Sequence, residues 1–471
     1  MTSTELQPKR RAVVIGASMA GLLAARVLSE RFDEVMLLER DVLPEGAQLR
    51  KGTPHAVHPH GLLARGREIL DMLFPGFTAA LLAQGAEAAD LGETVAFQVD
   101  RQTFARKPVG HLGLGVSRLS IEAELRRRVR ALAAVRFLDG VEVCELHHEG
   151  GRITGLSWSV LDSTGHQAAP QYLSADLVMD CSGRASRLPQ WLKTWGYEQP
   201  LEERVQVGIQ YVSAYFRRDP QIKSETAATL CTATPALPRP GVMMVQEPDP
   251  QGRARWVVGV GGYQGDHPKA TREGLLERAR QIGNADMIAL AESGEMLGPV
   301  IRYHYPFSQR RRYERLSRFP QGLLAMGDAL TSFNPIYGQG MTVVACQALA
   351  LRDALNVPAA QLAPRFFKAA ARVIDTPWQL AVGGDLALPM VQGPRPLPVR
   401  IVNAYIARLY RAAVQDAEVA AAFLKVVHLV AEPSSLFRPA IAWRVWQYGA
   451  AQPQGARTPR ADVHGAHAAH A

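Results

Sequence analysis

A short apolar strand that runs into a glycine-framed turn is the feature that most constrains how this chain folds. The β-branched and apolar run 11–15 is typical of a buried parallel strand, and it leads directly into the turn 16–21, GASMAG. A helical pattern follows at 22–28. The sequence therefore predicts a strand, a tight turn and a helix, the unit that opens a dinucleotide-binding domain.

An acid at the expected distance favours a nucleotide-binding role for this turn. A second strand, 34–39, ends in Glu39, about 20 residues beyond the turn, where the fingerprint places the partner of a ribose hydroxyl. Glycines let the backbone approach a pyrophosphate, and the helix N-terminus offers it unpaired N–H groups. Ser18 departs from the usual middle glycine, but its hydroxyl can donate to phosphate. Without Glu39, an ordinary strand, turn and helix with small residues would explain the motif equally well.

A second glycine-acid element lies far along the chain. The apolar run 323–326 precedes Gly327 and Asp328, and a further turn follows at 335–341. A nucleotide turn alone shows only that some cofactor is held, whereas the added Gly-Asp element indicates which one. Together the two elements predict that the cofactor is FAD.

Composition argues against several other classes of protein. The 471 residues are 47% hydrophobic, which suffices for a large core and for two or three domains. The net charge of +9 includes arginine clusters at 126–128 and 310–312, which we interpret as attraction for anionic cofactors. Solvated helix faces are the alternative for each cluster. Nucleic-acid binding is not expected, because no basic cluster is interleaved with exposed aromatic residues or lies in a known module.

No metal site, enzymatic nucleophile or membrane span is expected. His55, His58 and His60 crowd into a loop with two prolines, but no acid or cysteine completes a metal site, so we expect His60 to pack at the flavin edge. The four cysteines show no C-x-x-C spacing, which favours a reduced, cytoplasmic chain. No G-x-S-x-G elbow marks a hydrolase, and no run of about 18 uncharged apolar residues is present to span a membrane.

The remaining pattern predicts an α/β fold in which a Rossmann-like FAD-binding domain is split by an inserted antiparallel sheet. Alternation at 205–216, continued at 241–245 and 255–263, is typical of a sheet with one face toward a core or pocket. Helices are expected at 121–133, 272–282, 286–293, 341–355, 363–373, 399–414 and 417–430. We expect an FAD-binding domain at 8–85, 110–190 and 300–375, a substrate-binding sheet domain at 86–109 and 191–299, a C-terminal helical region at 376–450, and a disordered tail at 451–471.

These elements resemble a known family. The segments 16–21, 180–187 and 327–340 resemble those of class A flavin monooxygenases, which share the aromatic hydroxylase fold. The closer resemblance, over roughly residues 10 to 400, is to the bacterial group that contains the polyene epoxidases of polyether antibiotic pathways. It is carried by the segments 52–55, 58–63, 68–70, 74–76, 117–118, 180–187, 310–316 and 333–341.

The resemblance implies a set of FAD contacts. At the pyrophosphate and the adenosine it places Gly16, Ser18, Met19, Ala20, Gly21, Glu39 and, by its backbone, Val143. At the ribityl and phosphate region it places Arg40, Arg118, Gly327 and Asp328. Around the isoalloxazine it places Pro335, Gly338, Gln339, Gly340 and Met341, and the first four of these form the expected reaction site, with no side-chain nucleophile. A helix that starts near Gly340 would direct its positive end at the flavin.

The middle motif departs from the aromatic hydroxylases. Those enzymes carry Asp-Gly at a site tied to FAD and NAD(P)H, whereas this chain carries Asp180 and Gly183 in a D-x-S-G sequence. Flavin halogenases and prenyl reductases of the same fold also carry D-x-S-G. NADPH or NADH is the expected electron donor, and a partner reductase is the alternative.

The function implied by the resemblance is that of an FAD-dependent monooxygenase that uses NAD(P)H and O2. Through a flavin hydroperoxide it would epoxidise or hydroxylate a hydrophobic polyene, polyketide, prenylated or aromatic secondary metabolite. The expected pocket wall comprises 205–215, Met243, Met244 and Trp256, with ordinary core as the alternative.

Three other functions stay open. They are a prenyl or polyene reductase, a halogenase, although its W-x-W-x-I-P signature is absent, and a non-catalytic FAD-binding partner protein. The C-terminal helices are expected to cap the pocket, to rest on a membrane surface, or only to pack.

Overall fold

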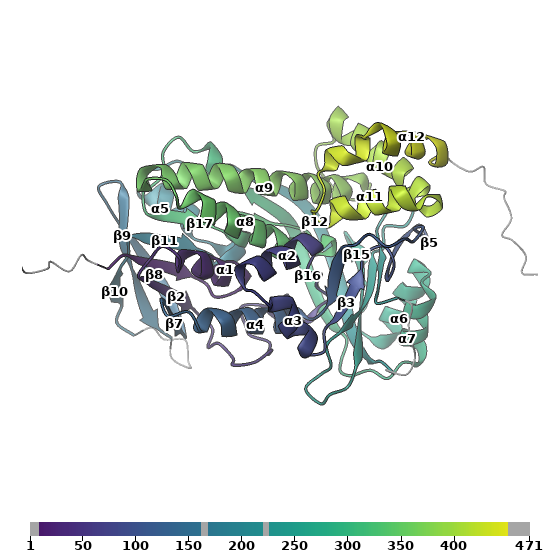
Figure 1. Ribbon diagram of the computed structural model, residues 1–471, viewed down its shortest axis with the longest axis horizontal. Helices are drawn as coiled ribbons and strands as arrows, with labels where there is room; N and C mark the ends of the chain where they lie inside the picture. The colour runs from purple at the N-terminus through teal and green to yellow at the C-terminus, as the bar shows by residue number, and fades with distance from the viewer. Residues whose placement is uncertain (1–8, 162–167, 220–225, 451–471) are drawn as a thin grey trace, which may run out of the picture.

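The computed structural model describes residues 9–161, 168–219 and 226–450. It shows an elongated α/β molecule with a parallel sheet at one end and a larger, mainly antiparallel sheet at the other (Figure 1). The tail at 451–471, which the sequence predicts to be disordered, lies outside the described residues. Within the described part, no helix has both the length and the hydropathy to cross a membrane.

The parallel sheet has five strands in the order β17-β11-β1-β2-β7. Its members are β1 (Arg11–Ile15), β2 (Glu34–Glu39), β7 (Val135–Asp139), β11 (Leu177–Asp180) and β17 (Leu323–Ala325). β1, β11 and β17 are almost wholly buried, as expected of near-continuous apolar runs covered on both faces. The expected Rossmann-like core is therefore present, and its strands come from segments far apart in the chain.

Helices and a small antiparallel sheet cover the parallel sheet. The helix α1 (Met19–Leu28) packs against α8 (Gly340–Ala354) and α4 (Arg118–Arg130). A three-stranded meander of β8 (Val141–Glu149), β9 (Arg152–Val160) and β10 (Gln171–Ser174) packs on β2 and β11. Shorter elements complete this half: α2 (Ala64–Leu73), α3 (Phe77–Ala83), α5 (Leu188–Thr194), β3 (Glu87–Asp90), β6 (Leu112–Gly115), η1 (Pro54–Val57), η2 (Gly183–Ala185), η3 (Tyr313–Arg315), η4 (Gly327–Ala329) and η5 (Pro335–Tyr337).

The inserted sheet has eight strands in the order β18-β16-β12-β15-β14-β13-β4-β5. Its members are β4 (Val95–Val99), β5 (Gln102–Thr103), β12 (Glu202–Arg217), β13 (Ala228–Cys231), β14 (Gly241–Gln246), β15 (Arg255–Tyr263), β16 (Ile301–Arg311) and β18 (Thr331–Ser332). One face packs on α6 (Arg272–Ile282) and α7 (Ala285–Ser293) around a separate apolar core. β16 pairs with β12, so this part of the 300–375 segment belongs to the inserted sheet.

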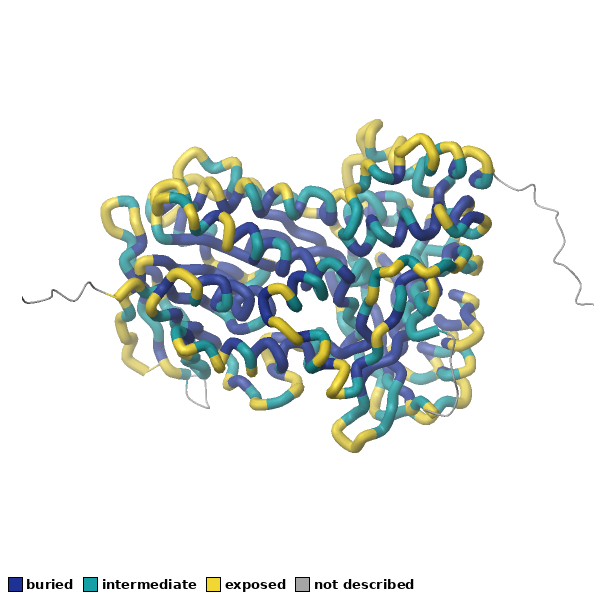
Figure 2. Tube along the Cα trace, viewed as in Figure 1, coloured by how far each residue is buried: buried dark blue, intermediate teal, exposed yellow. Residues whose placement is uncertain are grey.

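The C-terminal helices pack on an edge of that sheet. α10 (Leu397–Gln415), α11 (Ala417–Val427), η6 (Pro433–Phe437) and α12 (Pro439–Tyr448) share a core with Phe97, Val99 and Phe104 of the β4–β5 edge (Figure 1). They are joined to the rest by α9 (Ala359–Ala387), which continues through Pro364 and Pro377, whereas the sequence predicts a helix only at 363–373. Figure 2 shows buried backbone continuing from the parallel sheet into the inserted sheet.

Candidate functional site

The glycine turn between β1 and α1 is packed so closely that two of its glycines are required. Gly16 has φ +98°, and a Cβ atom there would lie 2.6 Å from the carbonyl oxygen of Cys181. A Cβ at Gly21 would lie 1.7 Å from the carbonyl oxygen of Gly16. No side chain caps the N-terminus of α1 at Ser18, so the turn presents backbone N–H groups to a ligand.

Glu39 is fixed at the end of β2, beside this turn. Its carboxylate accepts hydrogen bonds from the backbone N–H of Ala17 (2.7 Å) and of Asp41 (3.1 Å). The residue is buried, with 8% of its surface exposed. The neighbouring Arg40 is exposed, and Val143 is half-buried on β8. The predicted ribose-binding acid is thus held rigidly where β2 meets the turn.

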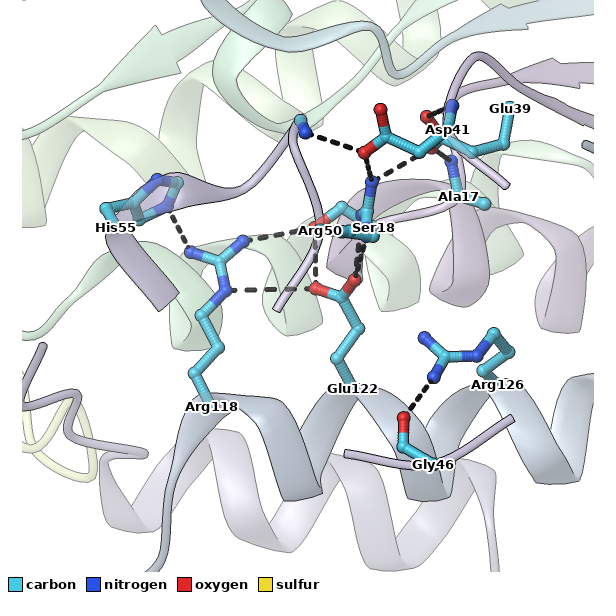
Figure 3. Close-up of polar contacts among 11 residues, drawn as sticks. Ala17, Ser18, Glu39, Asp41, Gly46, Arg50, His55, Arg118, Glu122 and Arg126 are labelled. Carbon is cyan, nitrogen blue, oxygen red and sulfur yellow. Dashed lines mark hydrogen bonds and ion pairs between the residues drawn. The ribbon is translucent and has the colours of Figure 1, made fainter. Parts of the chain in front are cut away.

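Two buried charges that the sequence analysis missed complete this end of the site. Arg50 binds Glu122 of α4 (2.7 Å) and lies 3.4 Å from Glu39 (Figure 3). Burial lowers the pKa of Arg50, but the carboxylates of Glu122 and Glu39 outweigh it and hold that pKa above its ordinary value. The only sequence signal was weak: Glu122 lies one helical turn after Arg118, a spacing suited to an ion pair.

Arg118 connects the glycine turn to the interior of the molecule. Its guanidinium donates to Ser18 Oγ (3.0 Å) and contacts His55 Nε2 (2.6 Å), while Ser18 Oγ donates to Glu122 (2.9 Å) (Figure 3). The same guanidinium acts on Asp328: burial raises the pKa of Asp328, and the charges of Arg118 and Arg184 partly offset that rise. Arg118 therefore lies between the two glycine-acid elements that the sequence predicts to act together.

Asp328 lies close enough to Arg118 and Arg184 for their charges to act on its carboxyl. The residue is exposed, although enough protein surrounds the carboxyl to raise its pKa. By contrast, Asp180 is fully buried and accepts bonds from Ser182 and Ser186, so it shapes the D-x-S-G turn. Gly183 in that turn has φ +84° and open space at its Cβ position.

The flavin-edge turn, predicted at 335–341, is formed by residues 334–338, which cap and contain η5, and by the N-terminus of α8 that follows. Gly338 has φ +63°, and a Cβ there would lie 3.8 Å from Gly61. A Cβ at Gly340 would meet nothing within 4 Å, so the first turn of α8 opens onto free space. Two buried polar atoms beside it, Gln339 Oε1 and Thr342 Oγ1, have no hydrogen-bond partner. Met341 is buried just inside α8.

Neutral histidines and tyrosines form a wall next to Arg118. Burial lowers the pKa of His55 to about 2, of His60 to about 3 and of His58 to about 4, with Arg118 adding to the effect at His55 and His60. His58 Nδ1 lies 2.8 Å from Ser213 Oγ, and its ring meets Tyr211 edge-on at 4.8 Å. The three imidazoles are therefore uncharged at neutral pH and present aromatic surface.

Other predicted features lie away from this wall. Met243 and Trp256, which the sequence analysis placed in a pocket wall, pack in the apolar core next to α6 and α7. The arginine clusters are used in internal contacts, since Arg128 pairs with Glu124 (2.6 Å), Arg310 with Asp375 (2.7 Å) and Arg311 with Glu202 (3.1 Å). The positive charges that act on Asp328 come instead from Arg118 and Arg184.

The residues present fit a flavin dinucleotide. The glycine turn and the free N-terminus of α1 suit a pyrophosphate, and Glu39 suits a ribose. Gln339 Oε1, beside the first turn of α8, is buried without a hydrogen-bond partner. Buried polar atoms are rarely left unpaired, so this oxygen marks a place for a polar group of a ligand.

Comparisons with known proteins agree with this fold. Protein Rv3254 of Mycobacterium tuberculosis is 33% identical over 402 residues, which cover 82% of this chain and 82% of that protein. The flavin-dependent brominase Bmp2 superposes with a TM-score of 0.64 at 13% identity, over 93% of this chain and 98% of the brominase. The p-nitrophenol 4-monooxygenase PnpA of Pseudomonas putida DLL-E4 gives 0.61 at 16% identity, over 89% and 98%.

These likenesses confirm the predicted fold class. A scan against models of known protein families found no match. Because the structural neighbours are less than 25% identical to this chain, they establish the architecture that it shares with flavin-dependent monooxygenases and halogenases, and nothing finer.

Proposed function

Because the chain belongs to the same family as protein Rv3254 of Mycobacterium tuberculosis and has the fold of flavin-dependent monooxygenases, we propose that it is an FAD-dependent monooxygenase. One observation carries the proposal: Arg118 bonds Ser18 in the glycine turn and acts on Asp328 and the histidine wall at the same time. A single ligand with a pyrophosphate at one end and a flat ring at the other would span these groups.

The chain's own residues supply binding, orientation and exclusion of water. Bound FAD supplies the redox chemistry by which O2 is activated, with NADPH or NADH as the electron donor. Glu39 and Arg118 would hold the dinucleotide half, while the positive end of α8 at Gly340 would favour negative charge on the flavin ring. Pro335 and Gly338 would shape the edge at which oxygen is transferred, which needs no side-chain nucleophile.

The wall beside this edge supports a hydrophobic substrate. Tyr211, Tyr303 and the neutral His58 present aromatic surface, and ring centroids 5.6 to 5.8 Å apart connect Tyr303 to the other two. Such a surface suits a polyene, a prenylated chain or an aromatic ring of a secondary metabolite. Epoxidation or hydroxylation is the proposed reaction, as in the polyether-pathway group that the sequence resembles. The cysteines of the described chain are all unpaired, which supports a cytoplasmic setting.

A halogenase-like oxidoreductase is the second candidate. The brominase Bmp2 matches the fold over 93% of this chain, and the D-x-S-G motif at Asp180 is shared with flavin halogenases. The missing W-x-W-x-I-P signature argues against it. A prenyl or polyene reductase shares the same motif and would need no oxygen.

Labelled dioxygen separates these reactions. Purified protein should be yellow and should consume NAD(P)H faster when a hydrophobic substrate from a panel of polyenes, quinolones and phenols is added. Under labelled O2, the product should carry one labelled oxygen atom. An unlabelled product formed equally well without oxygen would support a reductase, and a product that gains bromide or chloride would support a halogenase. Protein that binds no FAD would contradict the proposal.

A further inference from the structure

A fully buried carboxyl lies behind the flavin-edge turn. Asp385 near the end of α9 has no exposed surface. Its Oδ1 accepts a hydrogen bond from Asn334 Nδ2 (2.8 Å) and another from the Tyr337 hydroxyl (3.1 Å). Both donors belong to the turn at 334–338, so one carboxylate oxygen holds this turn at two points.

The surrounding backbone is shaped for these contacts. A Cβ at Gly384 would lie 2.6 Å from the Tyr337 hydroxyl, so glycine at this position makes room for that group. Asn334 is itself fully buried, and its Oδ1 accepts from the backbone N–H of Ile336 (3.3 Å). Asn334 therefore caps the short helix η5 and donates to Asp385 with the same amide. The shape of the turn depends on the pair.

The other half of the carboxyl group is unpaired. Asp385 Oδ2 has no hydrogen-bond partner, and no arginine, lysine or histidine of the described chain acts on the pKa of Asp385. Tyr263 of β15 faces the same group, and its buried hydroxyl lies near Asn334 without the geometry of a full hydrogen bond. A charge buried among neutral groups is costly unless it is neutralised.

Proton binding offers that neutralisation near neutral pH. Burial raises the pKa of Asp385 to about 7, although the bonds from Asn334 and Tyr337 oppose the rise. The titratable groups that face it are the hydroxyls of Tyr337 and Tyr263, with Tyr410 of α10 acting on Tyr337, and burial holds the pKa of each above its ordinary value. None of these tyrosines carries a charge at neutral pH.

We propose that Asp385 is a positioning residue that fixes the flavin-edge turn through Asn334 and Tyr337 and takes up a proton from solvent when the flavin is reduced. The inference rests on the proposed function, because it needs the turn to line the flavin. NAD(P)H would deliver two electrons and one proton to FAD, which leaves a negative charge on the ring. Asp385 contacts the turn that would line this ring, so a second negative charge on Asp385 would then become less favourable and its proton affinity would increase. By linkage, a protonated Asp385 favours reduction equally.

Proton uptake on reduction gives the first test. The midpoint potential of bound FAD would be measured anaerobically between about pH 6 and 8, a range that brackets the titration of Asp385. Wild-type protein should take up more than one proton per two electrons, whereas Asp385→Asn, which keeps the shape and the acceptor oxygen, should take up one. Asp353→Asn, which removes an exposed carboxylate on α8, is the matched control and should behave as wild type. An unchanged proton count in Asp385→Asn would overturn the inference.

Tyr337→Phe gives a second variant that keeps the carboxyl. The Tyr337 bond lowers the pKa of Asp385, so its loss should move the proton-uptake transition to higher pH. No movement would contradict the proposed contact.

A measurement on the apoprotein separates this inference from the proposed function. The folded-state pKa of Asp385 is raised, so its contribution to stability is present at low pH and is lost as pH rises from about 4 to about 7. Asp385→Asn should flatten the pH dependence of the free energy of unfolding over that range. An unchanged dependence would overturn the inference even if FAD binds. Failure to bind FAD with a flattened dependence would overturn the proposed function and the proton uptake that rests on it, and would leave only the titration of Asp385 and its hold on the turn.

Discussion

Replacing Glu39 with alanine should release FAD, because this carboxylate joins β2 to the glycine turn. In the protein it accepts a 2.7 Å bond from Ala17 N–H and is only 8% exposed, so it is rigidly aimed before any ligand arrives. Charge-assisted bonds from a carboxylate to ribose hydroxyls should contribute about 2 to 3 kcal/mol. Their loss should raise the dissociation constant for FAD about 30- to 150-fold.

The assay is a titration of apoprotein with FAD, followed by quenching of flavin fluorescence. Glu39→Ala also leaves the Ala17 N–H unpaired, which should lower stability by about 1 to 3 kcal/mol, so binding is measured well below the unfolding temperature. Glu39→Gln keeps one acceptor oxygen and should fall between alanine and wild type. Glu45→Ala removes an exposed acid six residues later and serves as the control. Wild-type affinity in a folded Glu39→Ala protein would refute the placement of the ribose.

Three further outcomes are expected. Asp328→Ala should lose FAD during dialysis, because its carboxyl lies next to Arg118, which bonds the glycine turn; full flavin occupancy would place the ribityl elsewhere. Gly338→Val puts a branched side chain at φ +63° close to Gly61, and should divert turnover from product to hydrogen peroxide, measured by a peroxidase assay on flavin-replete enzyme. Burial lowers the pKa of His58 to about 4, so the unfolded state binds a proton that the folded state does not, and stability should fall as pH drops from about 6.5 toward 4. His58→Gln should make that fall shallower in urea unfolding curves; an equal fall would contradict the assignment.

Local signals explain why the glycine turn was predictable from the sequence. Gly16, Gly21 and Glu39 lie within one strand–turn–helix–strand unit. The tight turn has no room for a side chain at the two glycines, and Glu39 accepts a hydrogen bond from that same turn. Arg50 and Glu122 meet only because α4 packs against the turn, so their pairing depends on tertiary structure. Apart from the spacing of Glu122 one helical turn after Arg118, no local pattern distinguishes them from solvated charges.

The same reasoning applies to two elements of the fold. β16 carries arginines where a strand usually alternates apolar and polar residues. Arg310 and Arg311 can be buried there because they form ion pairs with Asp375 and Glu202. α9 extends over 29 residues through Pro364 and Pro377, although proline removes a helical hydrogen bond. Phe366 and Trp378 of α9 both pack in the apolar core around the parallel sheet, and this packing stabilises the continuous helix.

The strand order of the parallel sheet has a consequence for how the protein is made. β1 pairs with β11, and β11 pairs with β17, so the sheet is incomplete until residues 323–325 have left the ribosome. Pairing strands that lie so far apart in the sequence closes long loops, which costs conformational entropy and slows folding. The edge of β1 that receives β11 is unpaired until residues 177–180 have been made, and the edge of β11 that receives β17 is unpaired until residues 323–325 follow. Unpaired strand edges of this kind are prone to aggregation. FAD would contact both the glycine turn, which is made early, and Asp328, which is made late. It would therefore bind only near the end of synthesis and would then stabilise the completed sheet.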